Sequence, residues 1–151
     1  MRVPIHSMAD TERLAARVAA VAERGDFIAL SGPLGAGKTA FARAFLYAAA
    51  AARGVAPPTE VPSPTFTLVQ SYDVRGLEVA HFDLYRIRDA AEAAELGLDE
   101  ALAAGVVLAE WPERLGPDLP RHRLDIALSL TPAGERAADI TPHGTWLTRA
   151  L

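Results

Sequence analysis

The chain has 151 residues and is half hydrophobic, which suits one globular domain and excludes a disordered segment. Its formal net charge is −4, so it lacks the basic excess typical of proteins that bind DNA or RNA tightly by their phosphates. It has no cysteine, no apolar run long enough to span a bilayer and no signal-peptide-like start, so we exclude thiolate metal sites and expect a cytoplasmic protein without a membrane partner.

The first half of the chain predicts a helix, a buried strand, a loop and a second helix. Apolar residues recur at helical spacing in residues 10–23. Residues 26–31 form a short apolar run typical of a buried strand, and residues 32–38 form a glycine-rich loop. Residues 39–52 are almost wholly Ala, Phe, Arg and Leu and predict a strong helix.

The second half predicts further strands, separated by a proline-rich loop and a helical segment. Residues 66–74 and 79–85 predict the two strands of an antiparallel hairpin. Residues 90–104 are helical in pattern but contain Gly97, which indicates two short helices. Three more strands are expected, at residues 106–110, 124–130 and 137–141.

These elements together predict the α/β class, with one domain over residues 1–151. A strand, a glycine loop and a helix, followed by further apolar strands, are typical of the P-loop NTPase fold. We expect a central mixed sheet, partly parallel with antiparallel strands added, flanked by helices. The chain shows neither a linker nor an internal repeat that would divide it.

The loop Gly32-Pro-Leu-Gly-Ala-Gly-Lys-Thr39 fits G-x-x-x-x-G-K-[ST] at every fixed position, with the only lysine of the chain at the required place. Glycines let the backbone amides turn toward phosphate oxygens, and the following helix adds its N-terminal dipole. The ammonium suits the β- and γ-phosphates, and the Thr hydroxyl suits Mg²⁺. A dinucleotide-binding loop is rejected because the glycines do not follow G-x-G-x-x-G. The expected nucleotide contacts are Leu34, Gly35, Ala36, Gly37, Lys38, Thr39 and Ala40.

Two carboxylates are candidates for holding magnesium or ordering water. Asp83 lies in a predicted apolar strand, and Glu110 ends another. Acidic groups at strand ends beside a phosphate loop suit Mg²⁺ coordination, directly or through water. His81 precedes Asp83 by two residues, but no second His or Cys completes a metal set, so a structural histidine is the expectation.

The segment Val61-Pro-Ser-Pro-Thr-Phe-Thr67 is a candidate switch-like loop. Two prolines stiffen it, and the hydroxyls of Ser63 and Thr65 are of the kind that reach a γ-phosphate or its attacking water. Trp111 follows Glu110 directly, and a tryptophan there serves equally well in the core or at the rim of a site.

Together these blocks resemble the TsaE (formerly YjeE) family, the bacterial ATPases of tRNA threonylcarbamoyladenosine synthesis. The phosphate loop, Ser63-Pro-Thr-Phe-Thr-Leu-Val69, His81-Phe-Asp-Leu-Tyr-Arg86 and Glu110-Trp-Pro112 occur in the family's order. Glu95-Leu-Gly-Leu98 fits between them, and the resemblance extends over residues 11–112. Pro33 departs from the acidic residue that the family often has there.

The resemblance implies a small Mg²⁺-dependent ATPase that acts on a complex of TsaB and TsaD and meets tRNA only through it, in the modification of adenosine 37. It implies that Thr39 and Glu110 hold Mg²⁺ and that Asp83 is the acidic residue of a Walker B-like block. Thr65 would belong to the switch-like loop, and Trp111 would lie near the phosphates. Thr11 is the nearest match to a nucleotide contact at the start of the first helix.

Two other functions remain compatible with the phosphate loop. A small kinase of a metabolite or nucleoside would need several arginines around the transferred phosphate, for which Arg86, Arg88 and Arg114 are available. A nucleotide-gated binding module with negligible turnover would share the loop and lack hydrolysis.

Overall fold

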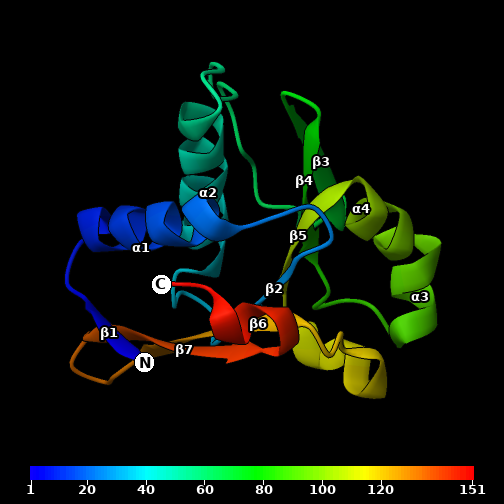
Figure 1. Cartoon of the computed structure of the whole chain (residues 1–151). Coiled ribbons are helices and arrows are strands. Elements are labelled where there is room, and N and C mark those ends of the chain that lie inside the picture. Colours follow the sequence, from blue (N-terminus) through cyan, green and yellow to red (C-terminus); the bar gives the residue numbers. More distant parts are fainter.

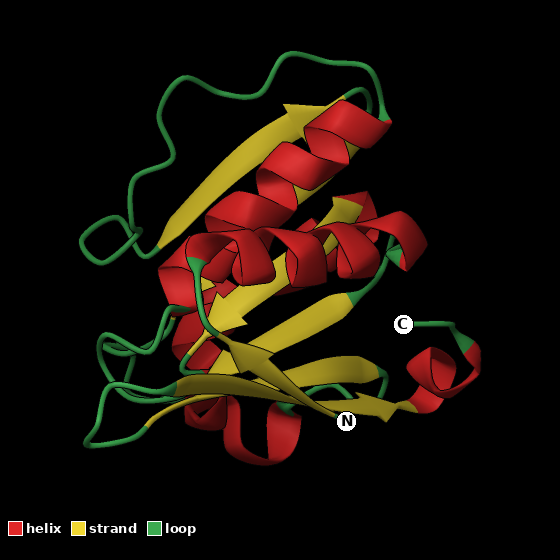
Figure 2. Ribbon diagram, turned by 90° about the vertical axis from the view of Figure 1, so that its left-hand side faces the viewer, coloured by secondary structure: helices red, strands yellow, loops and turns green.

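A seven-stranded mixed sheet forms the centre of the computed structural model, which describes residues 1–151 (Figures 1 and 2). The strand order is β1-β7-β6-β2-β5-β4-β3. Four neighbouring strands, β6, β2, β5 and β4, are parallel, and the outer strands are added antiparallel. The strands are β1 (Arg2–Ile5), β2 (Phe27–Ser31), β3 (Val69–Val74), β4 (Leu77–Asp83), β5 (Gly105–Glu110), β6 (Arg123–Leu130) and β7 (Arg136–His143). The predicted α/β class and the mixed sheet are confirmed.

The helices lie on both faces of this sheet. Figure 1 shows α1 (Met8–Val21) and α2 (Lys38–Ala52) on one side and α3 (Ala90–Glu95) and α4 (Leu98–Ala104) on the other. Two short 3₁₀ helices, η1 (Pro112–Asp118) and η2 (Gly144–Thr148), follow β5 and β7. Gly97 separates α3 from α4 in a left-handed conformation, as its position in the sequence predicts.

Alternation along the buried strands divides the core into two layers. In β5, Val106 and Leu108 pack toward α1 and α2, whereas Val107 and Ala109 pack toward α3, α4 and η1. Side chains of one strand alternate between faces, so Glu110 is on the α2 side together with Val106 and Leu108. This alternation decides which polar side chains meet the phosphate loop.

The β3–β4 hairpin and its contact with β5 depend on two glycines. A two-residue turn joins the strands, with Arg75 at φ 49° and Gly76 at φ 83°, as the right-handed twist of a tight hairpin requires. Gly105 begins β5 so close to β4 that a Cβ atom there would lie 1.8 Å from the Glu78 carbonyl oxygen. A side chain at residue 105 would therefore push β4 and β5 apart.

Several predicted strand boundaries are wrong, and three short elements escaped prediction. The strand expected from residue 66 begins at Val69, because the Pro64 carbonyl accepts a hydrogen bond from the Leu68 amide at 2.7 Å and Leu68 turns to φ 69°. The strand expected over residues 79–85 runs from Leu77 to Asp83, because Leu77 already pairs with Val74 across the two-residue turn. Strand β1 and the 3₁₀ helices η1 and η2 lie outside the predicted elements. None of the helices has the length and apolar composition that a bilayer crossing requires.

Candidate nucleotide-binding site

The loop between β2 and α2 has the backbone shape that a phosphate cradle needs. Gly32 and Gly37 have φ values of 137° and 108°, which a side chain would disfavour. A Cβ atom on Gly32 would also lie 2.3 Å from the Leu128 carbonyl oxygen, because β6 passes directly beneath the loop. Helix α2 begins at Lys38 without a side-chain cap, so its first amides are free to bind an anion.

Lys38 is a buried cation without a carboxylate partner. Its side chain donates to the carbonyl oxygens of Gly32 and Pro33, and its Nζ lies 4.0 Å from the centre of the Trp111 ring. Burial lowers the pKa of Lys38 below its ordinary value, and the negative charges of Glu110, Glu113 and Asp83 oppose that shift. A phosphate at this position would supply the anion that the ammonium lacks.

Asp83 and Glu110 lie side by side at the carboxyl ends of neighbouring parallel strands. They are register partners in the β4–β5 ladder, and both are buried. The Asp83 carboxylate also accepts the Tyr85 amide at 3.0 Å, which ends the strand in a tight turn. Two acidic groups therefore face the start of α2 from adjacent strands, as expected from their positions in the sequence.

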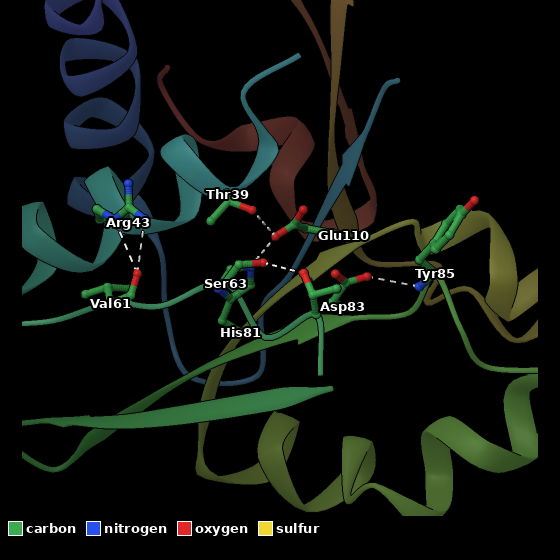
Figure 3. A network of polar contacts seen from close by, with 9 residues as sticks. Thr39, Arg43, Val61, Ser63, His81, Asp83, Tyr85 and Glu110 are labelled. Carbon is green, nitrogen blue, oxygen red and sulfur yellow. Dashed lines mark hydrogen bonds and ion pairs between the residues drawn. The ribbon is translucent and has the colours of Figure 1, made fainter. Parts of the chain in front are cut away.

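Glu110 joins the phosphate loop to the strands through a short polar network (Figure 3). Its Oε2 accepts a hydrogen bond from the Thr39 hydroxyl at 2.8 Å. The same oxygen lies 2.6 Å from Nε2 of His81, a buried residue of β4. The pair predicted to hold Mg²⁺, Thr39 and Glu110, is in direct contact.

The segment predicted to be switch-like reaches the same place from the opposite side. The long connection from α2 to β3 runs back along the molecule, as Figure 2 shows, and Arg43 of α2 donates to its Val61 carbonyl at 3.1 Å. This contact is drawn in Figure 3. Beyond it, the hydroxyls of Ser63 and Thr65 lie 2.7 Å apart at the edge of the site.

Trp111 closes the site beside Lys38. Its backbone is in the left-handed region at φ 59°, an uncommon conformation for a non-glycine residue that ends β5 in a sharp turn. The ring lies under the Lys38 ammonium, and on another side it contacts Tyr85, with 4.8 Å between ring centres. The local turn after β5 thus places the indole against the only lysine.

These side chains surround one pocket of about 340 Å³. All eleven lining residues are candidates named from the sequence: Leu34, Gly35, Gly37, Lys38, Thr39, Ala40, Ser63, Thr65, Asp83, Glu110 and Trp111. Residues from three other stretches of the sequence therefore converge on the phosphate loop.

Thr11 and Ala36 lie in a second pocket of about 240 Å³ next to the first. Gly37 and Ala40 line both pockets, so the two open on either side of the start of α2. The Ala36 amide donates to the Pro33 carbonyl within the loop. Thr11 of α1 thus lies beside the loop residue Ala36, in the pocket that does not contain the carboxylates.

Two features of the site were not predicted from the sequence. The first is the contact of His81 with Glu110, where a purely structural histidine was expected. The signal for it was in the sequence: His81 and Asp83 are two residues apart on one strand and so share one face. Arg136 of β7 donates to the Gly35 carbonyl at 3.2 Å and lines the second pocket. No local pattern links residue 136 to the loop, since the contact joins residues 101 positions apart.

Comparisons with known proteins agree on one family. The sequence profile of the family described as "Threonylcarbamoyl adenosine biosynthesis protein TsaE" matches residues 5–138. The tRNA threonylcarbamoyladenosine biosynthesis protein TsaE of Bacillus subtilis is 38% identical over 136 residues, covering 89% of this chain and 81% of that protein. The protein of the same name from Rickettsia bellii is 34% identical, covering 91% and 92%. The crystal structure of Bacillus subtilis YdiB superposes with a TM-score of 0.75 at 32% identity, covering 95% of this chain and 86% of that one.

Proposed function

Since the chain belongs to the TsaE family of threonylcarbamoyladenosine biosynthesis proteins, we propose that it binds and hydrolyses ATP for the modification of adenosine 37 in tRNA. In this proposal it acts on a complex of TsaB and TsaD in the cytoplasm and meets tRNA only through that complex. One observation carries the nucleotide part of the proposal: a buried, unpaired lysine at an uncapped helix start faces two buried carboxylates in one pocket.

The pocket supports distinct roles for its two ends. Lys38 and the amides at the start of α2 would bind the β- and γ-phosphates. Thr65 lies at the opposite edge, where a hydroxyl would contact the γ-phosphate or orient its attacking water. The adjoining pocket, with Thr11 and Arg136, would receive the nucleoside end of ATP.

The donor set fits Mg²⁺. The side chains offer hard oxygen ligands, the Thr39 hydroxyl and the Glu110 carboxylate, with Asp83 on the next strand. The structure contains no cluster of three His, Cys, Asp or Glu side chains arranged to bind a metal by themselves. Mg²⁺ commonly takes one or two protein oxygens and completes its shell with phosphate and water. When bound, the ion would neutralise the charge that develops on the phosphates during transfer.

The isolated protein should hydrolyse ATP slowly. Turnover in P-loop NTPases depends on a cation at the γ-phosphate, which a partner often supplies. No arginine lines the pocket, and Arg86 and Arg114 lie over the rings of Phe66 and Tyr85 instead. We therefore expect the TsaB–TsaD complex to complete the site or to rearrange it.

A steady-state assay at saturating Mg-ATP tests the proposal, with modified tRNA measured in the same reaction. The rate of ATP hydrolysis should rise when TsaB and TsaD are added at concentrations where a complex is shown to form. Equal rates with and without the complex would reject the partner-dependent site and leave the nucleotide site to be tested by itself.

The kinase alternative has less support from the site. Of the three arginines available to it, Arg88 pairs with Glu92, and the other two cover the aromatic rings named above. A kinase needs such side chains around the phosphate that it transfers. A screen for phosphorylated products among nucleosides and small metabolites distinguishes the two functions.

A further inference from the structure

His81 is a buried histidine with a single polar partner. Its side chain is 2% exposed, and Nε2 lies 2.6 Å from Oε2 of Glu110. A carboxylate oxygen accepts hydrogen bonds and cannot donate them, so Nε2 carries the proton in this contact. Nδ1 is also buried and has no partner. A core histidine without a role would be expected to satisfy both nitrogens, because an unpaired buried polar atom is unfavourable.

The contact is directed at one oxygen of Glu110. Oε2 accepts from both the Thr39 hydroxyl and His81, whereas no protein group donates to Oε1 (Figure 3). Two donors on one oxygen fix the rotation of the carboxylate about its last bond. Oε1 is then the oxygen left to serve a cation in the pocket that Glu110 lines.

The strand geometry explains why this arrangement is stable. His81 and Asp83 both lie on the face of β4 that is covered by α2, and Glu110 lies on the same face of the neighbouring strand β5. The imidazole therefore reaches across one strand spacing to the end of the next strand. Its partner Glu110 stands at the carboxyl end of the parallel strands, where ligands of such sheets bind.

We propose that His81 is a positioning residue that holds the Glu110 carboxylate in the orientation required to bind the divalent cation of the nucleotide. This inference rests on the proposed function, since it concerns the cation of the same site. Partners of this kind orient metal ligands in many proteins, and their loss commonly weakens metal binding by roughly 10- to 100-fold.

Two variants that differ by one methylene group provide the test. His81→Gln places an amide N–H about as far from the backbone as Nε2, whereas the amide of His81→Asn is too short to reach Glu110. Mg²⁺ is titrated calorimetrically into each protein saturated with ADP, and ADP affinity is measured separately in EDTA. Thermal unfolding of each variant is recorded in parallel.

The inference predicts a split between the two affinities. His81→Asn should raise the Mg²⁺ midpoint by roughly tenfold or more, and His81→Gln should stay within about threefold of the wild type. ADP affinity in EDTA should stay near the wild-type value in both.

Three outcomes would overturn the inference. An unchanged Mg²⁺ midpoint in His81→Asn rejects it alone and leaves the proposed function intact. A parallel loss of Mg²⁺ and metal-free ADP affinity in both variants assigns His81 to packing only. A wild-type protein that binds no ADP, or whose ADP complex takes up no Mg²⁺, rejects the proposed function and the inference with it.

Discussion

Two buried carboxylates at opposite ends of the central sheet have very different partners. Asp26 precedes β2 and is 5% exposed, and both of its oxygens accept hydrogen bonds from the Arg149 guanidinium. The guanidinium also lies over the Trp146 ring at 4.3 Å. Glu110 ends β5 and is 4% exposed, yet its partners are a hydroxyl and an imidazole, and no lysine or arginine forms an ion pair with it.

The difference indicates which charge serves the fold and which serves a ligand. A buried carboxylate that a guanidinium neutralises is complete, and it anchors the segment that carries the guanidinium. A buried carboxylate that pairs with no lysine or arginine is open to a cation brought by a ligand. Lys38 is its counterpart of opposite sign, a buried cation that donates hydrogen bonds only to carbonyl oxygens and otherwise lies over the Trp111 ring. Under the proposed function, the carboxyl end of the sheet would bind Mg²⁺ and phosphate, whereas the ion pair at the amino end serves stability.

The largest effect is expected at the amino end. Arg149→Met should lower the free energy of unfolding by about 3–5 kcal/mol, because it leaves the buried Asp26 carboxylate without its counter-charge. Urea unfolding measures the change. Adding Asp26→Asn should recover part of the loss, and ATP affinity of the folded protein should be unaltered. A fall of less than about 1 kcal/mol in the free energy of unfolding, or a loss of ATP affinity in the folded protein, would contradict the assignment of the amino end of the sheet to stability.

Lys38→Ala should have the second largest effect, on binding instead of stability. Losing a charge-assisted contact to phosphate should weaken ATP binding by about 2–3 kcal/mol. Because burial lowers the pKa of Lys38, its charge does not stabilise the folded state, so the unfolding temperature of the size-matched Lys38→Met should not fall. Calorimetry and thermal unfolding report the two quantities. Unchanged ATP affinity together with unchanged turnover would reject the phosphate-loop assignment.

Glu110→Gln tests the other unpaired charge. An amide keeps the shape of the side chain but is a poorer ligand for a hard cation, so kcat should fall about tenfold and the Mg²⁺ midpoint should rise. ATP affinity in EDTA should change little. Glu113→Gln is the matched control, since Glu113 is exposed and lies three residues further along the chain. If the Mg²⁺ dependence of ATP hydrolysis is the same in both variants, Glu110 does not bind the cation.

The sequence predicts the carboxyl end of the sheet better than the amino end. The phosphate loop, its strand and its helix form one continuous segment whose residue types are dictated by phosphate chemistry. Asp83 and Glu110 can be predicted because each is an acidic residue at the end of an apolar strand. Parallel strands bring their carboxyl ends to the same edge of the sheet, so the two side chains meet there. The family resemblance, carried by these blocks, is confirmed by the comparisons over residues 5–138.

What the sequence does not predict depends on pairings between distant residues. Strand β1 has only four residues, so the alternation of Val3 and Ile5 with Arg2 and Pro4 is too short to predict a strand, and β1 forms by pairing with β7 near the other end of the chain. The partner of Asp26, Arg149, is 123 residues away. Phe66 fits a strand by type, but the turn that Pro64 begins leaves it 82% exposed. Propensity and spacing carry no information on such contacts.

The smallest effect is expected at Thr65, at the open edge of the pocket. Its hydroxyl contacts Ser63 at 2.7 Å, and the residue is only half-buried, so Thr65→Val should change stability by less than about 0.5 kcal/mol. The phosphates would be held mainly by Lys38 and the α2 amides, so ATP affinity should also change little. A hydroxyl that orients the attacking water acts in the transition state. Its loss should raise the activation free energy by about 1 kcal/mol and so lower kcat roughly fivefold.

Thr67→Val is the matched control for Thr65→Val, because Thr67 is two residues away, exposed and hydrogen-bonded to Gln70 outside the pocket. Turnover of both variants is measured with the TsaB–TsaD complex present, where hydrolysis is expected to be fast enough to resolve a fivefold change. A loss of kcat in Thr65→Val alone, at constant ATP affinity, supports a role in the transition state. Equal kcat values in the two variants would show that Thr65 has no role in turnover, which would leave only the phosphate loop and the two carboxylates as functional groups of the site. A rise in KM with unchanged kcat would instead assign the hydroxyl to ground-state binding of the nucleotide.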